Sequence, residues 1–280
     1  MLDSAIIQQV TDIFGALENH YTLSARIASQ RDEAQQLVEF LNDFATTSAK
    51  INVEIHEADG ETLAFDLLKG GEPTGITFRG IPNGHEFTSL LLALLNADGK
   101  GKNLPDEGIV RRVKALTGDI HLQTYISLTC TNCPDVVQTL NIFALLNPNI
   151  RHEMVDAALF QSEVEARGVQ AVPSVFADGE LLHVGRGSLG ELLEKLEARY
   201  PSTGGIEVSG EPVERRFDVV VLGGGPAGAS AAIYSARKGL KVAILAERIG
   251  GQVKETVGIE NLISVPYTTG SELADNLRTH

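Results

Sequence analysis

One order of strands and helices occurs twice within the first 200 of the 280 residues of this chain. In the first copy, the spacing of apolar residues predicts a strand over 21–29, a helix over 32–44, a strand over 51–57, a strand over 75–79 and a helix over 87–95. In the second copy it predicts a strand over 120–128, a helix over 134–146, a strand over 151–155, a small helix ending at 168, a hairpin over 174–184 and a helix over 189–200. An internal repeat of about 100 residues predicts two copies of one α/β fold, each ordered β-α-β…β-β-α.

The two copies can be aligned on a shared spacing. Gln30 lies 43 positions before Pro73, and Cys130 lies 43 positions before Pro173. On this alignment, residues 30–33 of the first copy stand where the second copy has a C-x-x-C motif. We therefore expect one copy to have kept a chemistry that the other has lost.

The C-x-x-C motif contains the only two cysteines of the chain, Cys130 and Cys133. It lies between a predicted strand and a predicted helix, and the positive end of a helix dipole favours a thiolate. The i, i+3 spacing puts both sulfurs on one side of the first turn, close enough to form a bond. The pattern indicates a redox dithiol in which Cys130 attacks a disulfide and Cys133 resolves the mixed disulfide.

Two alternatives to a redox dithiol are half of a zinc site and a pair of incidental thiols. A structural zinc ion needs four cysteine or histidine ligands, and the sequence has no second C-x-x-C and no nearby H-x-x-x-H. We therefore expect no metal site.

The charge and hydropathy of the chain limit its partners and its location. The net charge is −14, and the basic residues do not gather in one tract, which argues against nucleic acid and anionic membranes as main partners. The longest apolar run, Leu90 to Leu95, is far shorter than the roughly 20 residues of a membrane span. The N-terminal residues lack the basic and apolar regions of a signal peptide. We expect a cytoplasmic protein, because one redox pair without structural disulfides fits a reducing compartment.

A glycine motif begins a different pattern near the C-terminus. Gly223, Gly225 and Gly228 follow an apolar strand over 217–222 and open a helix, and Glu247 ends the next strand 19 positions after Gly228. In such a βαβ unit the glycines allow close approach of a pyrophosphate to the helix N-terminus, and the carboxylate binds a ribose hydroxyl. The fingerprint by itself fits FAD or NAD, and a glycine turn without a ligand is a further alternative.

Residues 1–200 resemble the N-terminal domain of the flavoprotein (F) subunit of bacterial alkyl hydroperoxide reductase. The residues that carry this resemblance are 84–90, 127–137 and 171–176. The resemblance implies two thioredoxin-like folds in tandem, with the active dithiol only in the second. The middle of the family's motif is often His-Asn, whereas this chain has Thr131-Asn132, a difference that could shift the redox potential.

The same resemblance implies roles for two more residues. Pro173 is expected to form a cis peptide bond beside the dithiol and to orient the backbone of the substrate; the alternative is a proline at the start of an edge strand. Glu86 matches a glutamate of the inactive first fold that serves in proton transfer at the dithiol. The alternative for Glu86 is a solvated carboxylate at the start of a helix.

The C-terminal segment resembles the FAD site of thioredoxin-reductase-like flavoproteins. The resemblance rests on the Gly-Pro-Ala-Gly variant of the glycine motif, on Gly250-Gly251-Gln252 and on Asn261. It implies that FAD is bound by Gly223, Gly225, Pro226, Ala227, Gly228, Glu247, Gly251, Gln252 and Asn261. The Gly-Gly-Gln segment argues for FAD over NAD.

The predicted fold class is α/β, with tandem thioredoxin-like folds followed by the first βαβ unit of a Rossmann-like FAD-binding domain. We place the first fold at 1–102, the second at 103–200, a linker at 201–213 and the partial FAD-binding domain at 214–280. In the family a NAD-binding domain with a second C-x-x-C follows. One βαβ unit of about 65 residues is not expected to enclose FAD without the rest of its domain.

The function implied by the resemblance is disulfide reduction in defence against hydroperoxides. The dithiol would receive electrons from the flavin and NAD(P)H-dependent domain of the full-length chain and pass them to a 2-Cys peroxiredoxin, the C subunit, with a homodimer as the full-length form. Two alternatives are a general thioredoxin-like or glutaredoxin-like disulfide oxidoreductase without a flavin partner, and a non-catalytic docking module.

Overall fold

The structure, a computed structural model, describes residues 3–101, 104–202, 215–246 and 248–280. The chain divides into two units, Met1–Ile206 and Glu207–His280, and each is described by itself. The predicted boundary at 102–103 and residues 203–213 of the predicted linker lie outside the described residues, as does Glu247.

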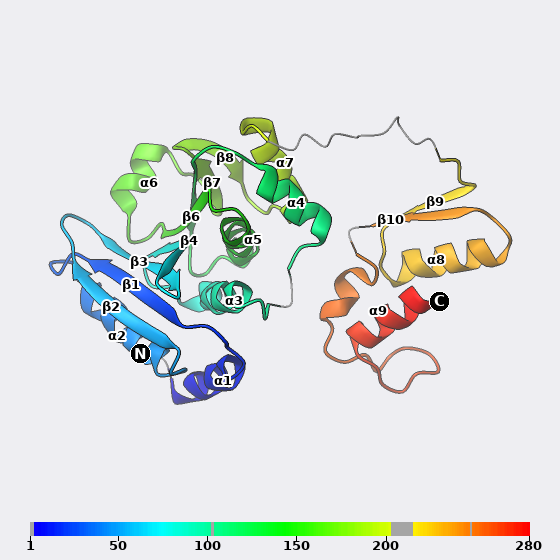
Figure 1. Ribbon diagram of the computed structural model, residues 1–280, viewed down its shortest axis with the longest axis horizontal. Helices are drawn as coiled ribbons and strands as arrows, with labels where there is room; N and C mark the ends of the chain where they lie inside the picture. The colour runs from blue at the N-terminus through cyan, green and yellow to red at the C-terminus, as the bar shows by residue number, and fades with distance from the viewer. Residues whose placement is uncertain (1–2, 102–103, 203–214, 247) are drawn as a thin grey trace. The chain divides into compact units, whose positions relative to one another are not determined.

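The first unit contains both copies of the repeat (Figure 1). The elements of the first copy are α1 (Ser4–Phe14), β1 (Tyr21–Ile27), α2 (Ala34–Ala45), β2 (Ile51–Glu57), β3 (Leu63–Lys69), β4 (Glu72–Arg79), the 3-10 helix η1 (Gly84–Glu86) and α3 (Phe87–Ala97). The elements of the second copy are α4 (Glu107–Ala115), β5 (Ile120–Ile126), α5 (Cys133–Leu146), β6 (Ile150–Asp156), α6 (Gln161–Arg167), β7 (Ser174–Ala177), β8 (Glu180–Val184) and α7 (Leu189–Arg199).

All eight strands of this unit form one sheet in the order β2-β1-β3-β4-β6-β5-β7-β8. In each copy the first strand pairs in parallel with the second and antiparallel with the third, and the third pairs antiparallel with the fourth. This identity of pairing confirms the predicted repeat. The copies are joined where β4 of the first pairs in parallel with β6 of the second.

Equivalent hydrogen bonds fix how the copies correspond around the dithiol. Ala58 N–H donates to the Ile27 carbonyl at 3.0 Å, as Ala157 N–H does to the Ile126 carbonyl. The helix that follows begins at Ala34 in the first copy and at Cys133 in the second. Ala34 therefore corresponds to Cys133. By the same count Arg31, whose N–H bonds to the carbonyl three residues back as that of Cys130 does, corresponds to Cys130.

The alignment on a shared spacing of 43 residues is wrong at the proline. Pro73 lies in the fourth strand of its copy, whereas Pro173 immediately precedes the third. Gly80 N–H donates to the Leu63 carbonyl as Gly185 N–H donates to the Pro173 carbonyl, so Leu63 corresponds to Pro173. The error arose because the sequence pattern did not predict β3.

The core of the first unit continues through both copies. In the first copy, Phe14, Phe40, Phe44 and Phe87 pack their rings in edge-on and stacked pairs 5.6 to 6.4 Å apart. Helix α3 of the first copy contacts α5 of the second. Burial of such side chains stabilises the fold by roughly 1.5–3 kcal/mol each, so each copy depends on the other for part of its core.

The second unit contains the predicted βαβ arrangement, β9 (Val219–Leu222), α8 (Pro226–Arg237) and β10 (Val242–Leu245), followed by η2 (Gly251–Glu255) and α9 (Gly270–Thr279). Strands β9 and β10 pair in parallel. Helix α9 was not predicted; Thr269 caps its N-terminus by accepting from the Glu272 N–H. In the described ranges, no helix is both long enough and apolar enough to cross a membrane.

Candidate redox site

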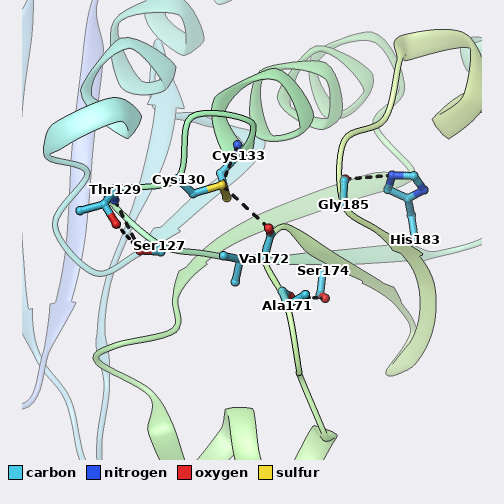
Figure 2. The surroundings of a disulfide bond; sticks show 9 residues. All are labelled: Ser127, Thr129, Cys130, Cys133, Ala171, Val172, Ser174, His183 and Gly185. Carbon is cyan, nitrogen blue, oxygen red and sulfur yellow. Dashed lines mark hydrogen bonds between the residues drawn. A yellow bond between two sulfur atoms is a disulfide. The ribbon is translucent and has the colours of Figure 1, made fainter.

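The two cysteines lie where the chain passes from β5 into α5, and they form a disulfide (Figure 2). Their Cα atoms are 5.5 Å apart, a separation that the first turn of a helix produces without distortion. Cys133 is fully buried, whereas Cys130 is partly exposed beside the exposed Thr131 and Asn132. An incoming disulfide can therefore reach Cys130 and not Cys133.

Two backbone groups face the Cys130 sulfur. The Cys133 N–H donates to Cys130 Sγ at 3.1 Å, and the Val172 carbonyl oxygen lies 3.9 Å from the same sulfur (Figure 2). Helix α5 has no side-chain cap, and Pro134 occupies its first turn. The free N–H groups and the helix dipole therefore act on Cys130 Sγ and stabilise negative charge on it after reduction.

Pro173 lies on the loop that faces the disulfide. The Val172–Pro173 peptide bond is cis, and Pro173 is buried. The loop is held by two hydrogen bonds, from the Gly185 N–H to the Pro173 carbonyl at 2.8 Å and from the Ser174 hydroxyl to the Ala171 carbonyl at 2.6 Å. The main chain at Val172 and Pro173 is thus fixed next to Cys130, where the backbone of a substrate would lie.

His183 was not singled out from the sequence. Its Nε2 atom lies 3.0 Å from the Gly185 carbonyl oxygen and 3.1 Å from that of Arg186 (Figure 2). A Cβ atom at Gly187 would lie 2.7 Å from the same nitrogen, so glycine at this position leaves room for the ring. His183 therefore fixes the loop that supports Pro173. A lone histidine in a predicted hairpin carries no sequence signal for this role.

Glu86 comes from the first copy but lies against the approach to the dithiol. The N–H of His85 donates to the Leu128 carbonyl at 3.2 Å, and a Cβ atom at Gly84 would lie 2.6 Å from that oxygen. Gly84 has φ +56°, so glycine is needed here both for its conformation and for this close approach. Segment η1 also contacts α5, whose first residue is Cys133.

The Glu86 side chain is fully buried, so the alternative of a solvated carboxylate is wrong. Neither carboxylate oxygen has a hydrogen-bond partner among the residues that the structure describes. Burial raises the pKa of the Glu86 carboxyl to about 7; the Ser89 hydroxyl, near but without hydrogen-bond geometry, acts in the opposite direction. A carboxyl with this pKa exchanges a proton readily near neutral pH. Its part in the reaction remains a prediction.

The glycine turn of the second unit has the geometry of a phosphate cradle. Gly223 has φ +108°, and a Cβ atom at Gly228 would lie 2.1 Å from the Gly223 carbonyl oxygen. Nothing lies within 4 Å of a Cβ atom at Gly225, the N-cap of α8, which has no side-chain cap. Pro226 begins the helix, so the free N–H groups of Ala227 and Gly228 remain available. These residues fit the pyrophosphate of a dinucleotide.

The structure brings one further predicted segment to this turn. The Gly250 N–H donates to the Gly224 carbonyl at 2.7 Å, and a Cβ atom at Gly251 would lie 3.3 Å from Gly225 Cα. The side chains of Gln252 and Asn261 are exposed, and no hydrogen bond between described residues joins either to the glycine turn. The roles of these residues in binding FAD remain predictions.

The protein families that match this chain agree with both halves of the structure. Residues 120–198 match the family described as thioredoxin domain, and residues 218–269 match that of FAD dependent oxidoreductases. The first range contains Cys130, Cys133 and Pro173. The second contains the glycine turn and Asn261.

The whole chain aligns with curated relatives. It is 43% identical over 282 residues to the F subunit of alkyl hydroperoxide reductase from Pseudomonas aeruginosa, and 45% identical over 280 residues to a protein of Bacillus subtilis named NADH dehydrogenase. Each alignment covers 100% of this chain and 53% of the relative. The chain thus spans about half the length of the curated relatives it matches.

Solved structures match the first unit. The crystal structure of the NTD_N/C domain of alkylhydroperoxide reductase AhpF from Enterococcus faecalis is 31% identical, with a TM-score of 0.64, over 70% of this chain and 100% of that one. A protein disulfide oxidoreductase from Aeropyrum pernix, at 20% identity and a TM-score of 0.64 over 75% of this chain and 98% of that one, shares the fold. The predicted fold class is confirmed.

Proposed function

Because this chain belongs to the family of the alkyl hydroperoxide reductase flavoprotein AhpF, we propose that its dithiol reduces the disulfide of a 2-Cys peroxiredoxin. The observation that carries the proposal is the Cys130–Cys133 disulfide at the N-terminus of α5, with Cys130 partly exposed and Cys133 buried. This asymmetry assigns attack to the first thiol and resolution to the second.

In the first step, the Cys130 thiolate attacks one sulfur of the partner's disulfide. The partner's S–S bond breaks, a mixed disulfide with Cys130 forms, and the second partner sulfur leaves as a thiolate that takes up a proton. In the second step, the Cys133 thiolate attacks Cys130 Sγ, breaks the mixed disulfide and releases the second partner thiolate, which is also protonated. Two electrons and two protons pass to the partner, and the Cys130–Cys133 disulfide is left.

Glu86 serves this exchange as a proton donor and acceptor. With a pKa of about 7, its carboxyl is partly protonated at neutral pH and can protonate a leaving thiolate. In the second step its carboxylate can take the proton from the Cys133 thiol. Pro173 and its neighbours present a fixed main chain to the partner, which orients the disulfide for attack on line with Cys130.

The dithiol is proposed to receive its electrons from a flavin-linked disulfide in the full-length protein. FAD, when bound, supplies hydride transfer from NAD(P)H and reduction of a neighbouring disulfide. The glycine turn at 223–228 would hold its pyrophosphate, with Gly251, Gln252, Asn261 and Glu247 as further contacts. Glu247 lies outside the described residues.

We place the full-length protein in the cytoplasm as a homodimer that works in defence against hydroperoxides. A reducing compartment keeps the reduced dithiol available between turnovers. The peroxiredoxin partner follows from the names of the relatives, which are alkyl hydroperoxide reductases.

The test is reduction of an oxidised 2-Cys peroxiredoxin by the pre-reduced chain, followed by thiol counting on the partner. We expect loss of activity in Cys130→Ser and a stable mixed disulfide with the partner in Cys133→Ser, because the second step is blocked. Wild-type rates from Cys130→Ser would refute the proposal. Equal rates with unrelated protein disulfides would favour a general disulfide oxidoreductase.

A further inference from the structure

The first copy has no thiols at the positions that correspond to its sister's dithiol. Arg31 stands in place of Cys130, Ala34 in place of Cys133 and Leu63 in place of Pro173. In the second copy these positions, with Gly185, border the surface that a substrate would approach. In the first copy, the equivalent surface is covered by residues of the second copy.

The Arg31 side chain reaches across that surface to the second copy. Its Nη2 donates to the Leu159 carbonyl at 2.8 Å, and its Nη1 donates to the Glu61 carbonyl at 2.9 Å. Its guanidinium lies 5.1 Å from the centre of the Phe160 ring, a cation–π contact. Its side chain is only 13% exposed and pairs with Glu33 at 3.3 Å.

The other border of the same surface is also covered by the second copy. A Cβ atom at Gly80, which corresponds to Gly185, would lie 3.0 Å from Asp156 Cβ and 3.4 Å from Leu159 Cδ1. The guanidinium of the preceding residue, Arg79, makes a second cation–π contact with Phe160, 4.4 Å from the ring centre. Residues 156–160 of the second copy therefore fill the place where a thioredoxin-like fold takes its substrate.

Arg79 also anchors this joint by charge. Its guanidinium makes a two-point contact with the Glu163 carboxylate, at 2.7 and 3.1 Å, and lies 3.7 Å from the Glu153 carboxylate. The Tyr125 hydroxyl donates to Glu163, and Arg167 lies 3.7 Å from the same carboxylate. Paired charges in this partly buried place hold their geometry better than exposed pairs do.

The joint is connected to the dithiol by a short piece of chain. Gly80 at the joint is six residues before Glu86, and the segment between them reaches Leu128 through Gly84 and His85. Since no hydrogen bond between described groups holds the Glu86 carboxylate, the position of this carboxylate depends on the anchors of its backbone. The joint is the anchor at one end of that segment.

We propose that the thiol-free site of the first copy is an internal docking joint, in which Arg31 and Arg79 clamp Phe160, and that this joint positions Glu86 at the dithiol. Arg31, Arg79 and Phe160 are positioning residues and touch no reacting atom. The inference rests on the proposed role of Glu86, and its test does not use a peroxiredoxin.

The test compares two small disulfides as substrates of the pre-reduced full chain. Bis(hydroxyethyl) disulfide releases a basic thiolate that needs a proton, whereas dithiobis(nitrobenzoic acid) releases a stable thiolate that needs none. The variants are Arg31→Met and Phe160→Leu, which weaken the joint from opposite sides and keep apolar volume. Arg26→Met is the matched control, since Arg26 belongs to the same copy, is 49% exposed and pairs with Asp66 on the surface.

We expect both joint variants to slow reduction of the hydroxyethyl compound by roughly three- to thirtyfold, as found for residues that couple through packing. Reduction of the nitrobenzoic compound should be unchanged, and Arg26→Met should match the wild type. In a Glu86→Gln background the joint variants should cause no further loss. Equal slowing of both substrates, no slowing of either, or the same loss in the Glu86→Gln background would overturn the inference.

Failure of the peroxiredoxin assay would leave these outcomes unaffected, so the two proposals can fail separately. Thermal unfolding of each variant shows whether it is folded. If Arg31→Met does not fold, Phe160→Leu with its retained apolar volume still decides the outcome.

Discussion

The buried Glu86 carboxyl predicts a specific dependence of stability on pH. Its pKa is about 7 in the folded chain against an ordinary value of 4.5, because the charged form is buried without a hydrogen-bond partner. The folded state therefore binds this proton more tightly than the unfolded state does. The contribution to stability is complete below pH 4.5 and is lost as pH rises through 7.

The size of this loss follows from the two pKa values. A difference of one pKa unit corresponds to 1.36 kcal/mol, so a rise from 4.5 to about 7 corresponds to about 3 kcal/mol lost between pH 4.5 and pH 8. The variant Glu86→Gln keeps the size of the side chain and removes the titration. We expect the two proteins to have similar free energies of unfolding near pH 5, and the variant to be more stable at pH 8 by up to about 3 kcal/mol.

The assay is urea unfolding of both proteins at pH 5 and pH 8. The near-ultraviolet circular dichroism of the buried Tyr21 and Tyr125 follows the unit that holds Glu86. Other groups with shifted pKa values, such as Asp156 and His152, titrate equally in both proteins and cancel in the difference. If the difference between the proteins is the same at both pH values, the reasoning from burial is refuted.

Two further predictions concern other parts of the chain. Arg79→Met should lower the free energy of unfolding by about 2 kcal/mol, because it leaves a partly buried carboxylate without its partner, whereas Arg26→Met should change it by less than about 1 kcal/mol; urea unfolding of both variants measures this, and equal effects would contradict it. Gly228→Ala should loosen the second unit, since its Cβ atom would lie 2.1 Å from a carbonyl oxygen, whereas Gly225→Ala meets nothing within 4 Å; amide hydrogen exchange over residues 215–246 separates the two, and equal protection in both would count against the packing described.

Much of the fold followed from sequence patterns because the strands near the dithiol are regular. The predicted strand over 51–57 is β2 itself, and the predicted helix over 134–146 differs from α5 by one residue. Strand β3 was missed because Asp66 and Lys69 interrupt its apolar pattern and glycines follow it, although Leu63, Phe65 and Leu67 are fully buried. Without β3, the copies could not be aligned beyond their first helix.

The site was predictable only in part, because some of its properties depend on contacts between the copies. The cysteine motif and Pro173 are local signals that the structure places together. The burial of Glu86 depends on contact of its segment with Leu128 of the other copy, which no local pattern contains. The exchange of Cys130 for Arg31 was hidden by an error of one residue in the alignment.

The parallel pairing of β4 with β6 has a consequence for how a duplicated fold can change. Main-chain hydrogen bonds hold this seam from Ile76–His152 to Arg79–Val155 and do not depend on particular side chains. After duplication, the first copy could therefore exchange its thiols for other residues without leaving its place in the sheet. An ancestor with two competing redox centres could in this way become a protein with one, whose second half is kept because the sheet and the core need it.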